Sequence, residues 1–587
     1  MKPIKELLTQ QFTEAFEACG YPGRFGEVVA SQRPELGQFQ CSGALGAAKA
    51  VKTAPMIAAG NIVEKLKSQP IFKNLSIAEP GFINITLTDE FLASFVQELV
   101  SDDRLGHHSL QNAATTVMDF GGPNIAKPMH VGHLRSAIIG ESLKRILRFA
   151  GEKVIGDIHM GDWGTQMGML ISELNLRKPD LPYFDEKFKG SYPSEPPATI
   201  DDLEEMYPAA NARCKSDENA MAGALKATVE LQQGRAGYRA LWKHFVDVSV
   251  KALKADFEGL GVSFDLWYGE SNYHDRIPAM IEYLKSKGVA ELDEGALVIK
   301  LETQPGKKEM PPLILIKSDG GYLYGTTDLA TVYERINDFK AGRILYVVDK
   351  RQSLHFEQVF QAAKKTGISG KASLEHVAFG TVNGPDGKPF KTRAGGVMKL
   401  KDLTAMTITE VLKKMEEAGV ARDYGEDERR GIAVKVGIAA VKFADLMNLR
   451  TSDYIFDIEK FTSFDGKTGP YHLYAAVRIK SILRKAQEKG VKPGPILPPT
   501  EYERELMLNI SRFAETVENA RRNLAPHFLC ELAHDLAQSF SRFYEHCHIL
   551  NEKDAARQSS WLALSMLCLR EFEQILSLLG IELPDRM

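Results

Sequence analysis

Two histidines three positions apart, His130 and His133, stand in the segment PNIAKPMHVGHLRS at residues 123–136. The segment lies between an expected buried strand at 115–120 and a helix whose apolar residues repeat at helical spacing up to Ala150. At such a junction an open α/β sheet binds its ligand, and the start of the helix favours negative charge. The imidazole N–H groups suit polyphosphate oxygens, and Gly132 leaves room for a nucleotide. The alternative is a pair of ordinary surface or capping histidines.

The elements around this segment predict an α/β fold, with a Rossmann-like parallel-sheet domain over residues 108–400. Four strand-like stretches alternate with helical ones, a pattern typical of a parallel sheet covered by helices. A stretch rich in Pro, Asp and Glu begins at Lys178 and predicts a surface insertion in this domain, at about 178–240. The strand-like stretches are 115–120, 154–158, 344–348 and 377–379.

Two further modules flank this domain. Residues 1–107 open with an amphipathic pattern and end with a strand-like stretch at 80–87, which predicts an N-terminal α+β module. Residues 401–587 predict a C-terminal all-α helical bundle, in which 492–500 forms a loop between helices. One helix of this bundle should carry an apolar stripe, made by Phe528, Leu532, Leu536, Phe540, Phe543 and Tyr544.

Composition excludes several classes of protein. Of the 587 residues, 44% are hydrophobic, 26% charged and 9% aromatic, which is ordinary usage for a folded globular chain. The net charge of -4 gives no hint of a nucleic-acid partner, although it does not exclude binding of RNA by shape. The six cysteines lack C-x-x-C spacing, so we expect free thiols and no structural metal. Without an apolar run of about 18 residues or an apolar start, we expect a cytoplasmic chain with no membrane contact.

The string H-V-G-H resembles the H-I-G-H element of class I aminoacyl-tRNA synthetases, and the whole of PNIAKPMHVGHLRS is similar to its version in the arginyl-tRNA synthetase family. The resemblance extends over essentially the entire chain, including 80–87 and 579–587. Four more stretches are similar to that family in the same order: GDWGTQMG (161–168), DLATVYER (328–335), DGKPFKTRAGG (386–396) and FTSFDGKTGPYHLYAAVR (461–478).

This resemblance implies catalytic roles for His130, His133 and Lys127. It also implies ATP binding by the two histidines together with Gly132 and Lys388. Cations are required near the β,γ-phosphates because negative charge grows there in the transition state.

The second signature element of class I synthetases, K-M-S-K-S, departs from its pattern in this chain. The corresponding stretch reads Phe390-Lys391-Thr392-Arg393, so the second lysine position falls on Thr392. The resemblance implies that Lys127 compensates for that lysine, while Lys391 and Arg393 supply the catalytic share of the loop. The alternative for these loop cations is a solvated basic turn.

A guanidinium substrate needs planar acceptors, because it presents fixed donors and keeps its charge. Asp119 at the end of the first strand and Asp328, four residues after Tyr324, are the carboxylate candidates. The resemblance implies that these three residues bind the arginine side chain. Without it, Asp119 could cap a turn, Asp328 could begin a helix and Tyr324 could belong to the core.

Further contacts are expected at the amino-acid end of the substrate and at the tRNA. The resemblance places Asn124 and Gln352 at the amino-acid end, and His159 is a candidate for the same cleft or a structural histidine. Aromatic and arginine side chains in the C-terminal bundle suit stacking on splayed bases. The resemblance implies anticodon contacts for Tyr471, Arg478, Tyr544 and Met587, with a structural role as the alternative for Tyr544.

Together these features predict an arginine–tRNA ligase of class I. It would use ATP with Mg²⁺, L-arginine and tRNA(Arg), act as a monomer and need bound tRNA before it activates arginine. Three alternatives remain: a class I synthetase of another specificity such as glutamyl, a small-molecule nucleotidyltransferase, and a non-catalytic tRNA-binding paralogue. Asp119 and Asp328 disfavour the first, because a glutamate pocket needs cationic groups.

Overall fold

The computed structural model describes residues 1–587 except 304–308, 319, 385 and 389–397. At its centre lies a four-stranded parallel sheet of order β11-β10-β5-β6, and α5 (Val131–Phe149) joins β5 to β6. This sheet confirms the predicted α/β class. Its strands are β5 (Thr115–Phe120), β6 (Val154–Asp157), β10 (Ala341–Val347) and β11 (Ser373–His376).

One strand prediction is wrong by a few residues. The last strand runs over Ser373–His376, whereas the sequence predicted 377–379. Val377 and Phe379 are buried, and Val377 still donates its N–H to Tyr346 O at 2.8 Å, but they follow the strand as the chain leaves the sheet. Buried apolar residues therefore continue beyond the hydrogen-bonded strand. The apolar pattern of the sequence predicted which residues are buried, but not where the strand ends.

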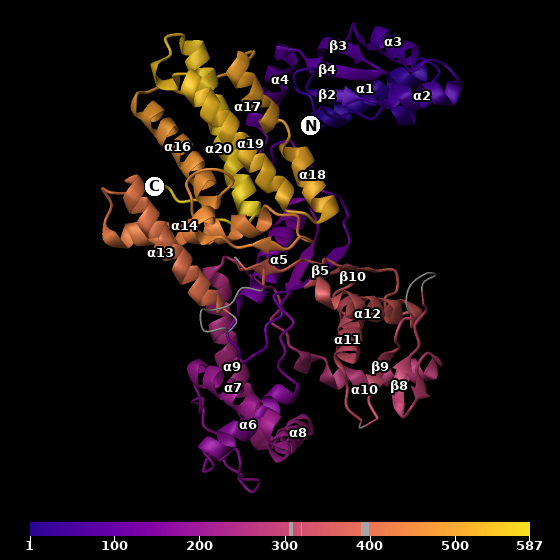
Figure 1. Ribbon diagram of the computed structural model, residues 1–587, viewed down its shortest axis with the longest axis vertical. Helices are drawn as coiled ribbons and strands as arrows, with labels where there is room; N and C mark the ends of the chain where they lie inside the picture. Colours follow the sequence, from indigo (N-terminus) through magenta and orange to yellow (C-terminus); the bar gives the residue numbers. More distant parts are fainter. Residues whose placement is uncertain (304–308, 319, 385, 389–397) are drawn as a thin grey trace.

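Figure 1 shows the N-terminal module and the C-terminal helices on one side of the sheet and two smaller lobes on the other. One lobe contains the helices of the predicted insertion, so this surface stretch is largely helical. The lobe consists of α6 (Thr165–Arg177), α7 (Ile200–Ser216), α8 (Glu218–Gln232) and α9 (Ala236–Gly259), of which α7 and α8 lie within 178–240, while α6 precedes this stretch and most of α9 follows it. The other lobe contains α10 (Ile277–Ser286), α11 (Tyr324–Asn337), α12 (Ser353–Lys365), β7 (Glu291–Asp293), β8 (Ala296–Ile299) and β9 (Leu313–Ile316).

The N-terminal module is the predicted α+β unit. The first helix, α1 (Ile4–Ala18), buries Ile4, Leu8 and Phe12 at helical spacing against an antiparallel sheet of order β1-β2-β4-β3. The remaining elements are β1 (Val29–Ala30), β2 (Phe39–Cys41), α2 (Gly43–Val51), α3 (Pro55–Leu66), β3 (Phe72–Ala78), β4 (Phe82–Leu87) and α4 (Asp89–Val100).

The C-terminal region is helical, as expected, apart from a short pairing of β12 (Val382–Asn383) with β13 (Tyr454–Ile455). The predicted apolar stripe lies on α19, where Leu532, Leu536 and Phe540 are buried. The stretch 492–500 connects α16 to α17 without helix or strand. The helices are α13 (Leu400–Ala418), α14 (Glu426–Leu446), α15 (Ile458–Phe461), α16 (Gly469–Glu488), α17 (Glu501–Ile510), α18 (Phe513–Asn523), α19 (His527–His546) and α20 (Ala555–Leu578).

Two further expectations concern thiols and membranes. All six cysteines are free, and each except Cys19 is buried. Within the described parts of the chain, none of the helices combines the length and the apolar character that crossing a bilayer requires.

One buried carboxyl in the C-terminal helices makes no hydrogen bond to the described residues, and the charge of Arg512 only partly offsets its burial. Glu571 of α20 has an exposed fraction of 0%, and within the described residues neither of its carboxyl oxygens has a hydrogen-bond partner. Burial raises the pKa of Glu571 well above its ordinary value. The folded chain therefore keeps a proton that the unfolded chain releases above its ordinary carboxyl pKa, so this group lowers stability as pH rises.

We predict that Glu571→Met stabilises the C-terminal helices by about 1–3 kcal/mol at pH 8 and by much less at pH 5. Thermal unfolding of both proteins at the two pH values measures the difference. Glu573→Met on the same helix changes an exposed carboxylate and serves as the control. Equal stabilisation by Glu571→Met at both pH values would contradict this account.

Candidate active site

The two histidines of residues 123–136, which we call the HVGH segment, form a compact pair at the start of α5. His130 is the N-cap residue, and its Nδ1 accepts the backbone N–H of Gly132 at 3.0 Å. Nδ1 of His133 accepts the backbone N–H of His130 at 3.2 Å, and the two rings stack with centroids 3.9 Å apart. A Cβ on Gly132 would lie 2.7 Å from the His130 ring, so the glycine makes room for this histidine, whereas we expected room for a nucleotide.

Both histidines are neutral at physiological pH. Burial lowers the pKa of His130, and burial with the charges of His130 and Lys127 lowers the pKa of His133 to about 3. Because each Nδ1 accepts a backbone N–H, the single proton of each neutral ring lies on Nε2. The pair therefore offers two Nε2–H donors at a helix N-terminus, an arrangement that suits phosphate oxygens.

A serine fixes the start of α5 between two strand ends. Ser136 Oγ accepts the N–H of Gly121, just after β5, at 2.8 Å and donates to Val347 O, at the end of β10, at 2.7 Å. Since β10 and β6 flank β5 on opposite sides, the chain order reverses at this point, where open α/β sheets bind their ligands.

The chain beyond the second signature element also reaches the histidines. Val131 N–H donates to Met398 O at 3.1 Å and Leu400 N–H donates to Met129 O at 2.9 Å, so residues 398–400 pair with the HVGH segment. Lys388 lies in a turn closed by its carbonyl, which accepts the N–H of Gly384 at 2.8 Å. The predicted catalytic residues Lys391 and Arg393 lie outside the described residues.

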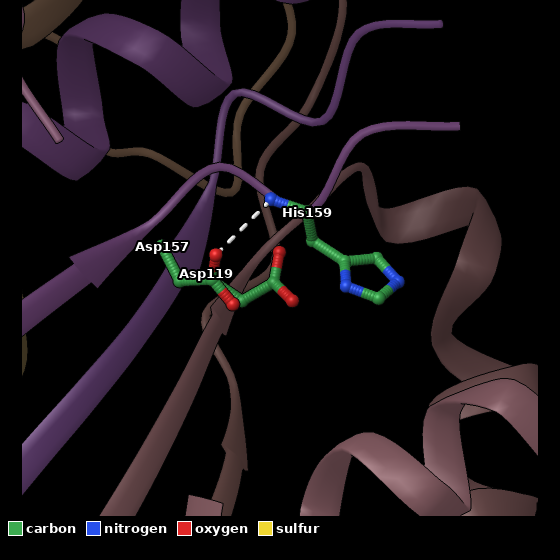
Figure 2. A group of neighbouring side chains, drawn as sticks. All are labelled: Asp119, Asp157 and His159. Carbon is green, nitrogen blue, oxygen red and sulfur yellow. Dashed lines mark hydrogen bonds between the residues drawn. The ribbon is translucent and has the colours of Figure 1, made fainter. Parts of the chain in front are cut away.

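Asp119 has a partner that the sequence did not predict. Arg335 of α11 is fully buried and donates from one guanidinium nitrogen to Asp119 Oδ2 at 2.7 Å and to Asp157 Oδ2 at 2.6 Å. Figure 2 shows the two carboxylates together at the strand ends, with the His159 ring beside them. Ligand atoms of these three residues lie within 4.8 Å of one another, but the guanidinium already supplies positive charge to both carboxylates.

His159 lies beside two buried aspartates and one aromatic ring. Its backbone adopts a left-handed φ of 44°, its N–H donates to Asp157 Oδ1 at 3.4 Å, and its ring lies 5.4 Å from that of Tyr273. The chain that follows His159 approaches Asn124 closely at Gly161, whose carbonyl accepts the N–H of Ile125 at 3.1 Å. A Cβ on Gly161 would lie 2.1 Å from Asn124 Oδ1, so only glycine allows this approach.

The structure adds Glu270, a carboxyl that the sequence analysis missed. It begins the short helix Glu270–Asn272, and Asp162 fixes that helix by accepting the N–H of Ser271 at 2.9 Å and its hydroxyl at 2.6 Å. Burial, with smaller contributions from Asp162 and Asp328 and an opposing one from His159, raises the pKa of Glu270 to about 7. No motif in the sequence marks Glu270, because its role depends on tertiary neighbours.

Tyr324 and Asp328 occupy the first turn and a half of α11, as their spacing predicted. Tyr324 begins the helix with an exposed fraction of 71%, and desolvation, followed by the charge of Glu270, raises its pKa. Asp328 accepts from His355 Nε2 at 2.5 Å, and this bond raises the pKa of His355. Gln352 is exposed and ends a short helix before α12. Electrostatic influences connect Glu270 with Tyr324, Asp328 and His159, so these four residues form one acidic group, which we call the acidic pocket.

The four residues expected to bind the anticodon lie in the C-terminal helices. Arg478 of α16 lies over the ring of Tyr544 of α19, with its Cζ 4.3 Å from the ring centroid. Tyr471 lies two turns before Arg478 on α16, and its ring is 6.0 Å from that of His534. Met587 packs against the core. The structure brings Arg478 and Tyr544 together and places Tyr471 near them on the same pair of helices.

Three family models match this chain. Residues 95–458 match the model described as tRNA synthetases class I (R), catalytic domain. Residues 4–87 match the arginyl tRNA synthetase N-terminal domain and residues 472–587 the DALR anticodon binding domain. The chain belongs to the arginyl-tRNA synthetase family.

Relatives and solved structures agree with this membership. The chain is 49% identical to a protein named arginine--tRNA ligase from Alkaliphilus oremlandii, over 99% of this chain and 100% of the relative. It is 50% identical to one of the same name from Hyphomonas neptunium, over 100% of both chains. The arginyl-tRNA synthetase structure from Plasmodium falciparum matches with a TM-score of 0.82 at 26% identity, covering 100% of both chains. The Thermus thermophilus structure shares the fold, with a TM-score of 0.79 at 22% identity and full coverage of both chains.

We predict that Arg335→Met lowers the free energy of unfolding by about 3–5 kcal/mol, because it leaves Asp119 and Asp157 buried without a cation. Thermal unfolding at pH 7.5 measures the loss. The control is Arg343→Met, which breaks a partly exposed bidentate pair with Glu375 at 2.9 Å and should cost about 1 kcal/mol or less. A loss no larger than that of the control would refute the structural role of Arg335.

Proposed function

We propose that this chain is an arginine–tRNA ligase: it forms arginyl-adenylate and pyrophosphate from L-arginine and ATP, then transfers the arginyl group to the terminal adenosine of tRNA(Arg). The observation that carries the proposal is the pairing of a neutral histidine couple at a helix N-terminus with a separate acidic pocket. Family membership over the full chain supports it. ATP enters with Mg²⁺ as the substrate complex, and the enzyme acts as a monomer.

In the first half-reaction, an oxygen of the arginine carboxylate attacks the α-phosphorus of ATP as the bond to the β-phosphate breaks. The Nε2–H groups of His130 and His133 donate to phosphate oxygens, and Lys127 supplies a cation beside them. These groups stabilise the charge that grows on the departing pyrophosphate. Lys388, Lys391 and Arg393 supply the contribution of the second signature element.

The acidic pocket binds the guanidinium group. Glu270 and Asp328 supply the carboxylates, with Tyr324 and His159 beside them, and the influence of Asp328 on Glu270 supports their proximity. Fixed planar donors favour paired carboxylate acceptors, which gives selectivity for arginine. Asn124 and Gln352 hold the amino-acid end. Asp119 stays a prediction, because it shares Arg335 with Asp157 in this structure.

In the second half-reaction, the 2′-hydroxyl of the terminal adenosine attacks the arginyl carbonyl and AMP leaves. The domain at 1–107 binds tRNA, that at 108–400 carries the chemistry with the insertion at about 178–240, and that at 401–587 reads the anticodon. Tyr471, Arg478, Tyr544 and Met587 provide the anticodon contacts. Retention of the histidine pair and of the acidic pocket argues against a non-catalytic paralogue.

ATP–pyrophosphate exchange with each of the twenty amino acids, with and without total tRNA, tests the function. We expect exchange with arginine alone, and only when tRNA is present, because tRNA binding should complete the site by induced fit. Exchange with another amino acid would refute the specificity. Robust exchange in tRNA-free enzyme would refute the coupling, and no exchange in folded, tRNA-binding protein would favour the paralogue.

Glu270 predicts a pH dependence of arginine use. Its pKa of about 7 means that the carboxylate needed for the guanidinium is lost below neutrality. We therefore expect kcat/KM for arginine, measured by exchange with saturating ATP and tRNA, to fall up to tenfold per pH unit below about pH 7.

Glu270→Gln should raise the KM for arginine about 10- to 100-fold and flatten this pH profile, with the KM for ATP little changed. Glu282→Gln, which alters an exposed carboxylate of α10, is the matched control. A Glu270→Gln profile identical in shape to that of the unmodified chain would remove Glu270 from the arginine pocket.

A further inference from the structure

Tyr207 of α7 reaches from the helical insertion to a lysine of the HVGH segment. The ammonium nitrogen of Lys127 lies 4.3 Å from the centroid of the Tyr207 ring. The same ammonium lowers the pKa of both His130 and His133, so it lies beside the two imidazoles. The tyrosine face therefore holds this cation on the phosphate side of the site.

A second contact from α7 reaches residues 398–400, the segment that pairs with the HVGH segment. Glu204, one turn before Tyr207, accepts from Lys399 Nζ at 2.7 Å. Lys399 forms an isolated bridge with His130. Because residues three apart share a helix face, one face of α7 contacts both strands of this pairing.

Tyr207 also borders the arginine pocket. It contributes to the raised pKa of Tyr324, the exposed tyrosine that begins α11. On the other side of the segment, Ala126 N–H donates to the buried Ser249 Oγ of α9 at 3.0 Å. Ser249 of α9 thus fixes the backbone at Ala126, and Tyr207 of α7 contacts the side chain of Lys127.

We propose that Tyr207 is a positioning residue for adenylate formation, which holds the Lys127 ammonium where charge develops on the departing pyrophosphate. This inference rests on the proposed function and adds a role for the insertion in the chemistry. A lysine side chain has a flexible four-carbon stem, so without the ring its ammonium would spread over many rotamers. A cation over an aromatic face is held by the ring quadrupole, and a cation already in place need not be ordered during the reaction.

The first test compares Tyr207→Phe with Tyr207→Leu in arginine-dependent ATP–pyrophosphate exchange with tRNA present. Phenylalanine keeps the ring face, so Tyr207→Phe should keep kcat within about twofold of the unmodified chain. Tyr207→Leu should lower kcat roughly three- to thirtyfold while the KM for arginine changes less than about twofold. The matched control is Tyr283→Leu, which should leave kcat unchanged. Tyr283 lies on α10, and its ring centroid is 5.7 Å from the Nζ of Lys287.

A double-mutant cycle separates positioning of Lys127 from a general effect on the fold. In a Lys127→Met background, Tyr207→Leu should have less than about a twofold effect, because the group that it positions is already absent. A full additional loss in that background would overturn the proposal, as would an unchanged kcat in Tyr207→Leu.

Amine labelling reports the contact without any activity. Competitive acetylation read by mass spectrometry should modify Lys127 several-fold faster in Tyr207→Leu than in the unmodified chain or in Tyr207→Phe. An unchanged labelling rate would overturn the proposal. An unmodified chain that lacks arginine-dependent exchange would instead refute the proposed function, and labelling would still decide whether Tyr207 holds Lys127.

Discussion

Helix α5 is buried along most of its length, so its polar side chains need partners, and several of them bond to other parts of the chain. Arg135 donates to Asp445 of α14 at 3.0 Å and to Ser452 O at 2.9 Å. At the other end, Ser142 Oγ donates to Leu578 O of α20 at 3.0 Å and Arg145 donates to Ser577 O. The helix that presents the histidines is therefore bonded to α14, to the loop that follows it and to the end of α20.

The two sides of the phosphate site differ in how they are held. The histidine side belongs to α5 and to the strand ends, where Ser136 bonds to the backbone and the buried Arg335 joins the carboxylates of Asp119 and Asp157. The lysine side depends on contacts from α7, which are partly exposed: Lys399 has a side-chain exposed fraction of 38%. Parts of a site that must move are found where burial is low, so adjustment to substrate falls on the insertion side.

The sequence predicts much of this arrangement because local patterns specify it. The 115–120 strand, the following helix and the α19 stripe depend on periodicity along single elements, and all three form as expected. The HVGH histidines are likewise local, because a helix N-terminus orients both of them. Arg335, Glu270 and Tyr207 could not be predicted, since each acts through a partner distant in sequence: Arg335 is 216 residues from Asp119.

In the proposed arginine pocket, the acids differ in the counter-charge that each of them has. Asp119 and Asp157 share one guanidinium, and Asp328 has His355, so each acid already has part of a counter-charge. Glu270 forms no ion pair among the described residues, and burial, with smaller contributions from Asp162 and Asp328 against the opposing charge of His159, raises its pKa to about 7. A guanidinium entering beside Glu270 pairs with the carboxylate form and drives its proton off. A neutral side chain of the same shape would gain no such pairing, so this group of acids favours a positively charged partner.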